Sequence, residues 1–467
     1  MRKLLVCSPL LVAACATSDV SLGGPGTIVR IEPEAAGTNC EDGGVAIHTG
    51  LDDDGDRYLD DDEIDSTQYV CDAVSPVQCQ GGIIAGTTTI RSSADWAALD
   101  GAHCVDGDLL IAGVDGELAD LPDLGIVTGD LVIAGNAELT SLAGLASISR
   151  VGGTYLVQGN LALASLDGLG ALTRAGSLNI VGNNALVDLA GLENLVTFNG
   201  NLAINNNAGL TSLHGLDNFV STLGQIKISQ NRALAATDAI TSLQTAALIE
   251  ITGNSELPVI NLPSLDRLET RLLITDNPAL TDVTLPKLTT IGDFVRIDGN
   301  AELVRISAPS LVTTASLLIN DDTALTTLEL PNLTYVTNKV ELLVLPSLDR
   351  IPLPALTAIG GDVTVEQVPL LPDFRGLEGV QSIGGTFVVR QNPALASFAG
   401  LDALTFIAGS LTVNQNLGLT GMNGLGQLDE IGGNLTITNN ASLPTGQAQT
   451  FANGVTVGGD TTISGNQ

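Results

Sequence analysis

The chain has 467 residues, with 18 Lys and Arg against 52 Asp and Glu, so its formal net charge is −34. Such an acidic chain repels nucleic acids and anionic lipid surfaces, and we expect neither as a partner. Aromatic residues make up only 3%, so the core must be built from Leu, Ile, Val and Ala. No apolar run of about 20 residues follows the N-terminal segment, and no later membrane span is predicted.

Residues 1–14 are predicted to be a signal peptide. A basic pair precedes an apolar run that is too short to span a bilayer. The run ends in V-A-A-C, which resembles the bacterial lipoprotein signal and implies that Cys15 is lipidated and anchors the chain to a membrane. Because Ala16 and not Asp follows, the resemblance implies an outer-membrane or cell-surface location. The alternative is an ordinary secretory signal. Residues 15–26 are rich in Ser, Gly and Thr and are predicted to be a tether.

Four cysteines remain after the signal peptide and Cys15. They are Cys40, Cys71, Cys79 and Cys104. An even set in an exported protein predicts disulfides, for which three connectivities are open. We favour Cys40–Cys71 and Cys79–Cys104, because each pair then brackets one block of distinct composition. No pair has the C-x-x-C spacing of a metal site.

A small acidic module is predicted over residues 27–75, with the sequence D-D-D-G-D-R-Y-L-D-D-D-E at its centre. This spacing matches a twelve-residue calcium loop, in which several oxygens wrap around one Ca²⁺ ion. The predicted ligands are Asp52, Asp54, Asp56, Tyr58 (through its carbonyl), Asp60 and Glu63. Arg57 stands where such loops have Gly, at a cost on the order of 1 kcal/mol. The alternative is a solvated acidic loop without an ion. Residues 37–71 resemble a small Cys-bracketed module of bacterial surface proteins.

An Asn recurs at steps of 22 to 26 residues over most of the remaining chain, which predicts a solenoid. Each Asn is expected to close a turn and to stack on its neighbours in a structural ladder. The ladder comprises Asn136, Asn160, Asn183, Asn207, Asn231, Asn254, Asn277, Asn300, Asn392, Asn416, Asn440 and Asn466, and in three coils Asp322, Leu345 and Val368 take its place.

Each coil opens with a short strand whose middle residue points outward, as in L-V-I at 131–133. Apolar residues at every third position follow, which fits short extended segments joined by bends. We therefore predict a mainly β fold, a right-handed parallel β-solenoid of about 15 coils over residues 109–467. A cap over residues 77–108 precedes it. Apolar outward residues such as Leu273 are expected to be exposed, and Lys227 and Glu250 are expected to pair across strands.

The stretch from Cys79 through D-W-A-A-L to Cys104 resembles the start of a receptor L domain. Such domains occur in insulin- and EGF-receptor ectodomains and in fungal GPI-anchored cell-wall proteins of the sporulation-specific family. The resemblance covers residues 79–467 and implies a Cys-clipped cap, a short helix and a leucine-rich-repeat-like solenoid. The chain has far more coils than one L domain and lacks a second Cys-rich clip. Two L domains joined near residues 340–372 are the alternative to one array.

Catalysis is poorly supported by the sequence. The three histidines, His48, His103 and His214, are scattered, and no nucleophile elbow, phosphate loop or zinc motif occurs. We expect a non-enzymatic cell-surface lipoprotein whose solenoid is a scaffold for protein or glycan binding or for envelope structure, with no small-molecule substrate. The alternative is a surface polysaccharide lyase or hydrolase, because those enzymes also use parallel β-helices.

Overall fold

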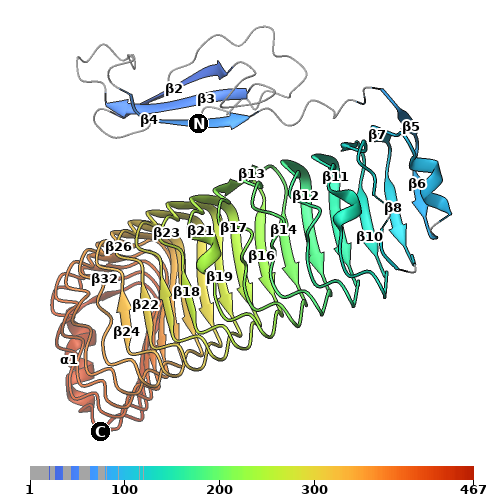
Figure 1. Cartoon of the computed structure of the whole chain (residues 1–467). Helices are drawn as coiled ribbons and strands as arrows, with labels where there is room; N and C mark the ends of the chain where they lie inside the picture. Colours follow the sequence, from blue (N-terminus) through green and yellow to red (C-terminus); the bar gives the residue numbers. More distant parts are fainter. Residues whose placement is uncertain are drawn as a thin grey trace. The chain divides into compact units, whose positions relative to one another are not determined.

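The computed structural model describes four N-terminal strands and residues 79–467 apart from residues 80, 93, 115 and 119 (Figure 1). The chain divides into two compact units, residues 1–78 and residues 79–467. The predicted signal peptide, Cys15, Cys40 and the acidic loop over residues 52–63 lie outside the described residues, and so does the side chain of Cys71. In the described part of the chain, no helix is long and apolar enough to cross a membrane.

The first unit contains a four-stranded antiparallel sheet in the order β1-β2-β3-β4. Its strands are β1 (Val20–Ser21), β2 (Thr27–Glu34), β3 (Gly44–Leu51) and β4 (Ile64–Cys71). Ala46 on β3 is buried, and Nδ1 of His48 lies 2.8 Å from the hydroxyl of Thr67 on β4. The contact between His48 and Thr67 joins β3 and β4, the paired strands that flank residues 52–63.

The second unit is a parallel β-solenoid of about 16 turns with a period of about 23 residues, as predicted. Two ladders of strands follow its length. The main ladder contains β6 (Thr88–Ile90), β8 (Leu109–Ala112), β10 (Leu131–Ala134), β14 (Leu202–Asn205), β16 (Gln225–Ser229), β27 (Val363–Glu366), β29 (Phe387–Arg390), β31 (Leu411–Asn414), β33 (Leu435–Thr438) and β35 (Thr461–Ser464). The second ladder contains β5 (Ile83–Ala85), β7 (Cys104–Asp106), β9 (Ile126–Val127), β13 (Thr197–Phe198), β15 (Ser221–Thr222), β26 (Ala358–Ile359), β28 (Ser382–Ile383), β30 (Phe406–Ile407), β32 (Glu430–Ile431) and β34 (Thr456–Val457).

In several coils one long strand runs through both ladders and bends where they meet. These strands are β11 (Arg150–Gln158), β12 (Arg174–Val181), β17 (Thr245–Thr252), β19 (Arg267–Thr275), β21 (Thr290–Asp298), β23 (Thr313–Asn320) and β25 (Tyr335–Leu343). A separate parallel sheet occurs in the middle coils, with strands β18 (Val259–Asn261), β20 (Asp282–Thr284), β22 (Arg305–Ser307) and β24 (Thr327–Glu329). Figure 1 shows these strands stacked coil upon coil.

The core is aliphatic and continuous from the first coil to the last. On β10, Leu131 and Ile133 are fully buried while Val132 between them is half-buried, and this alternation recurs in the other main-ladder strands. The expectation that outward apolar residues such as Leu273 are exposed is wrong, because they too are half-buried. Neighbouring coils lie only about 4.8 Å apart, so outward side chains cover one another. Large exposed apolar side chains occur at turns and bends, as at Leu161 and Leu223, and in strands outside the main ladder, as at Val259 and Phe406.

Both ends of the solenoid depart from the regular coil. The predicted Cys79–Cys104 disulfide is present, and β5 pairs with β7, so parallel pairing begins within the segment predicted as a cap. The short helix at 95–99 is the 3₁₀ helix η1 (Asp95–Leu99), which buries Trp96. Two further 3₁₀ turns, η2 (Ala143–Leu145) and η3 (Asp238–Ile240), lie at bends. The single α-helix of the described residues, α1 (Thr445–Gly454), lies in the last coil.

Candidate functional site

A row of asparagine side chains runs through the interior of the solenoid. Each of these side chains is fully buried except that of Asn466 in the last coil, which is half-buried. Asn207 is representative. Its backbone N–H donates to the amide oxygen of Asn231 in the next coil at 3.0 Å. Its Nδ2 donates to the carbonyl of Ile180 in the preceding coil at 2.9 Å, and its own Oδ1 accepts the N–H of Asn183 at 3.0 Å. Each rung therefore satisfies buried polar groups in three successive coils.

The backbone geometry explains the residue that precedes each rung. That residue has a positive φ in every coil from Gly135 onward, including Asn206 at 55° and Gly299 at 71°. Gly and Asn tolerate this left-handed conformation, which accounts for the G-N and N-N pairs in the sequence. Val344 adopts it as well, at φ 55°, and a β-branched residue is strained there.

Asparagine is replaced in three coils of the ladder, and in two of them the rung is apolar. Asp322 occupies a rung with no exposed surface, and Leu345 and Val368 fill the next two positions with apolar side chains. The second run begins when Asn392 accepts the N–H of Val368 at 2.8 Å. Asp322 is thus the last polar rung of the first run.

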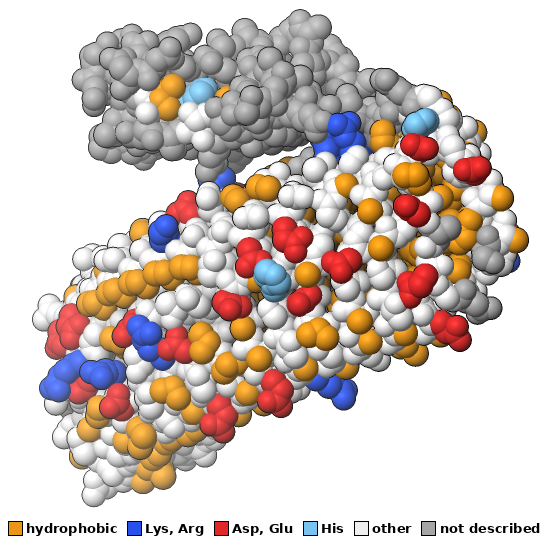
Figure 2. All heavy atoms as spheres, viewed as in Figure 1, with side chains coloured by type: hydrophobic (Ala, Val, Ile, Leu, Met, Phe, Trp, Pro, Cys, Tyr) orange, Lys and Arg blue, Asp and Glu red, His pale blue; other side chains and the backbone are white. Residues whose placement is uncertain are grey.

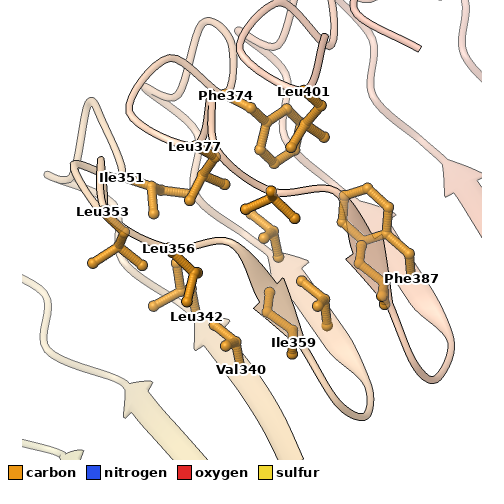
Figure 3. A pocket seen from close by; sticks show the side chains of 14 residues that line it. Val340, Leu342, Ile351, Leu353, Leu356, Ile359, Phe374, Leu377, Phe387 and Leu401 are labelled. Atoms are coloured by element: carbon orange, nitrogen blue, oxygen red, sulfur yellow. The ribbon is translucent and has the colours of Figure 1, made fainter. Parts of the chain in front are cut away.

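A small cavity of about 20 Å³ lies inside the solenoid beside this interruption (Figure 3). Its lining is entirely apolar, with Val340, Leu342 and Leu353 on one side and Phe374 and Phe387 on the other. The rings of Phe374 and Phe387 meet edge to face with their centroids 5.9 Å apart. A space of about one water volume with no polar partner is a packing defect and not a ligand site.

Charged side chains on the main ladder pair with one another. Lys227 and Glu250 are Cα partners on adjacent strands, and their charged atoms lie 2.8 Å apart, as predicted. Near the interruption, Lys339 pairs with Glu341 at 2.7 Å and Arg390 with Glu366 at 2.6 Å. Figure 2 shows acidic and basic side chains next to each other toward the C-terminal end of the solenoid. These pairs are half-exposed and each contributes only about 0–1 kcal/mol.

The third sheet carries a further charged row. Arg305 on β22 donates to Glu329 on β24 at 2.7 Å, and its other terminal nitrogen lies 3.5 Å from Asp282 on β20. The hydrogen bond from Arg305 holds the pKa of Glu329 below its usual range. The row joins three coils at the surface.

An open groove of about 240 Å³ lies where the long strands bend from the second ladder to the main ladder. It spans β19, β21, β23 and β25. Its lining is Arg267, Leu268, Glu269, Thr290, Ile291, Gly292, Thr313, Thr314, Ala315 and Thr337. A cation, a carboxylate and several hydroxyls lie along this depression. The sequence did not single it out, because its residues occupy ordinary repeat positions.

The sequence-predicted site residues fall into separate groups. The Asn ladder and the Cys79–Cys104 pair lie in the solenoid. The calcium ligands from Asp52 to Glu63 lie outside the described residues, so their geometry stays a prediction. Among the residues that are described, no three His, Cys, Asp or Glu side chains are grouped closely enough to hold a metal ion.

The N-terminal unit matches a known domain family. Residues 27–71 match a domain of unknown function, DUF7151, and this match contains the acidic loop and β2 to β4. No curated protein matches the chain. The family match carries no activity, so a function must be argued from the molecule itself.

Proposed function

We propose that this protein is an exported, lipid-anchored surface scaffold whose solenoid presents its outer face to a protein or glycan of the cell envelope. The proposal rests on a difference between the inward and the outward residues of each coil. The buried Asn ladder and the aliphatic core fix the backbone, while the outward residues vary freely from coil to coil. A repeat array built this way offers a long, regular surface for recognition.

The proposed anchor is lipid attached to Cys15 through a thioether and an amide bond, as in lipoproteins. The sequence V-A-A-C after a short apolar run supports it. The segment predicted as a tether is shorter than expected, because Val20–Ser21 form β1 and pair with β2, so only residues 16–19 separate Cys15 from the first strand. Lipid attachment gives stable membrane binding when the chain carries more than one acyl group. The net charge of −34 opposes adsorption of the folded units to anionic lipid. This repulsion would keep the outer face of the solenoid away from the membrane and accessible to a partner.

The proposed role of the N-terminal module is to hold one Ca²⁺ ion at residues 52–63. The alternating carboxylates support this role, since Ca²⁺ prefers several oxygen ligands from one short loop. The loop joins β3 to β4, which are paired antiparallel. An ion bound there would neutralise part of the carboxylate repulsion at the end of that sheet.

Lipid labelling in a bacterial host tests the anchor. The wild-type protein should incorporate labelled palmitate and fractionate with membranes, whereas Cys15→Ser should do neither. Equal labelling of both proteins, or a soluble wild type, would overturn the anchored scaffold. A reducing-sugar assay with envelope polysaccharides tests the non-enzymatic assignment, and sustained release of sugar ends would show that the solenoid is an enzyme.

A further inference from the structure

One corner of the solenoid carries no charged side chain over five successive coils. This corner is the turn that contains the ladder, and the residue before each rung and the two residues after it are exposed or half-buried there. We call these outward residues of the five coils the neutral ridge. They lie within residues 344–347, 367–370, 391–394, 415–418 and 439–442.

The same corner is charged in many of the earlier coils, as at Glu138, Arg232, Asp276 and Asp321. No more than three consecutive coils are uncharged there before residue 344. Because the whole chain has a net charge of −34, most surfaces of two copies repel each other. The neutral ridge is a surface on which two copies can meet without opposing like charges.

A ladder of glutamine side chains runs along the neutral ridge. Nε2 of Gln367 donates to Oε1 of Gln391 at 3.0 Å, and Nε2 of Gln391 donates to Oε1 of Gln415 at 3.1 Å. Within the described residues, Oε1 of Gln367 and Nε2 of Gln415 make no hydrogen bond. The ladder therefore has a direction, with a free acceptor at one end and a free donor at the other.

Two exposed leucines lie beside this ladder, one on each side of its centre. Leu370 is 54% exposed and Leu417 is 52% exposed, and they belong to the coils that precede and follow the coil of Gln391. Pro393 lies between them and is exposed as well. A single exposed apolar side chain is ordinary, but an uncharged strip of this kind is typical of a contact surface.

The free groups and the leucines are arranged so that the neutral ridge is complementary to itself. In an antiparallel pair of ridges, a two-fold axis beside Gln391 brings the coil of Gln415 against the coil of Gln367 in the second copy. Nε2 of Gln415 then meets Oε1 of Gln367 in the other chain, twice over. Leu417 lies against Pro369 and Leu370 of the other chain, and both leucines of each copy are covered.

We propose that the neutral ridge pairs antiparallel with the neutral ridge of a second copy of this chain. Five coils about 4.8 Å apart and three residues across give a contact roughly 19 Å long and about 10 Å wide. This area is smaller than that of a stable dimer, so dissolved chains should pair weakly. Many copies on one surface would strengthen the contact by multivalency.

The antiparallel arrangement places the first coils of the two solenoids at opposite ends of the pair. It therefore favours contact between copies that are anchored to two facing surfaces over copies anchored side by side on one. This consequence rests on the proposed lipid anchor, whereas the pairing of the ridges does not.

Sedimentation equilibrium of the full chain tests the pairing, from about 10 μM to about 1 mM and in about 0.5 M salt to screen the net charge. The wild type should form a dimer with a Kd on the order of 0.1 to 1 mM. Leu417→Glu should raise this Kd at least about 5-fold, because a charge then enters an apolar contact.

Leu161→Glu is the matched control. Leu161 follows the rung Asn160 as Leu417 follows Asn416, it is 56% exposed, and its substitution adds the same charge outside the neutral ridge. Its Kd should stay within about twofold of the wild-type value. Both sites are exposed, so neither variant should melt at a temperature different from that of the wild type.

A pair of opposite charges tests the antiparallel arrangement. Leu370→Lys alone should also weaken the dimer. Combined with Leu417→Glu in one chain, it places Lys and Glu against each other in both halves of an antiparallel pair. The double variant should therefore associate at least about 3-fold more tightly than either single variant.

Three results would overturn the proposal. One is a wild-type chain that stays monomeric up to about 1 mM, the upper end of the weak range expected for so small a contact. Another is a control, Leu161→Glu, that is weakened as much as Leu417→Glu. The third is a double variant that associates no more tightly than the single variants. None of these results affects palmitate labelling, which tests the anchor separately.

Discussion

The carboxylate of Asp322 accepts two hydrogen bonds from Asn300, one from the backbone N–H at 2.8 Å and one from Nδ2 at 3.1 Å. Its other oxygen, Oδ2, is buried without a partner. In the preceding coil, the atom of Asn300 that corresponds to this oxygen is Nδ2, which donates to the carbonyl of Ile274 at 3.0 Å. A neutral carboxylic acid can make a donation of this kind, but a carboxylate cannot. Burial accordingly raises the pKa of Asp322 to about 7.

We predict that Asp322 makes the solenoid less stable as the pH rises. The pKa in the unfolded chain is near 3.8 and the folded value is about 7, so between them the folded state holds the extra proton. The free energy of unfolding should fall across this window by up to about 4 kcal/mol. Asp322→Asn should remove this part of the pH dependence. Urea unfolding at pH 5 and pH 8 measures it, and equal pH slopes for the two proteins would contradict the prediction.

Asn207→Leu should destabilise the solenoid by about 3 kcal/mol or more. The change leaves the N–H of Asn183 and the carbonyl of Ile180 buried without their partners. Asn179→Leu is the matched control, because Asn179 points outward from β12 and should change stability by no more than about 0.5 kcal/mol. Thermal melting of the three proteins gives the comparison. A ladder that contributes nothing would leave all three melting temperatures equal.

Val344→Asn should raise the free energy of unfolding by about 1 kcal/mol. Val344 is held at φ 55°, a conformation that Asn adopts at lower cost. Chemical denaturation measures the gain. Val304→Asn serves as the control, because Val304 is an exposed residue just before β22 and is not among the positions of positive φ. If Val344→Asn is the less stable of the two variants, backbone strain at Val344 does not determine the change in the free energy of unfolding.

Reduction of Cys79–Cys104 should loosen the first coil. The bridge spans 25 residues, and closing a loop of that size lowers the entropy of the unfolded chain by an amount worth about 3 kcal/mol. Amide hydrogen exchange should therefore rise in β5 to β7 after Cys79→Ala and Cys104→Ala are combined. Exchange in β31 and β33 should stay unchanged, because each coil contacts only its neighbours. Uniform loss of protection along the chain would contradict this view.

The acidic loop should bind Ca²⁺ through its alternating carboxylates. Titration of the full chain should give heat that is lost in the double variant Asp54→Asn with Glu63→Gln, because both substitutions remove charged oxygen ligands. Arg57→Gly should tighten binding, since Gly tolerates the turn required at the sixth position. No heat from the wild type at millimolar Ca²⁺ would show that the loop is only a solvated acidic segment.

The repeat period was sufficient to predict the solenoid, its inward and outward positions and the ladder that includes Asn207. All of these depend on one residue type recurring at one place in a coil. The helix α1 was not predicted, because T-G-Q-A-Q-T-F-A-N-G has two glycines and no apolar stripe. Its residues account for the longer step from Asn440 to Asn466. The groove was not predicted because its lining residues, such as Thr290 and Thr313, occupy ordinary repeat positions.

The two runs of asparagine rungs have a mechanical consequence. Stability in a stacked array is approximately a sum over neighbouring coils. Among the described residues, the coil of Leu345 has no ladder amide joining it to either neighbouring coil, and it adjoins the internal cavity, so it forms the weakest link of the array. When force pulls the two ends of the solenoid apart, rupture should start there. The array would then behave as two elastic segments in series and give a stepwise extension.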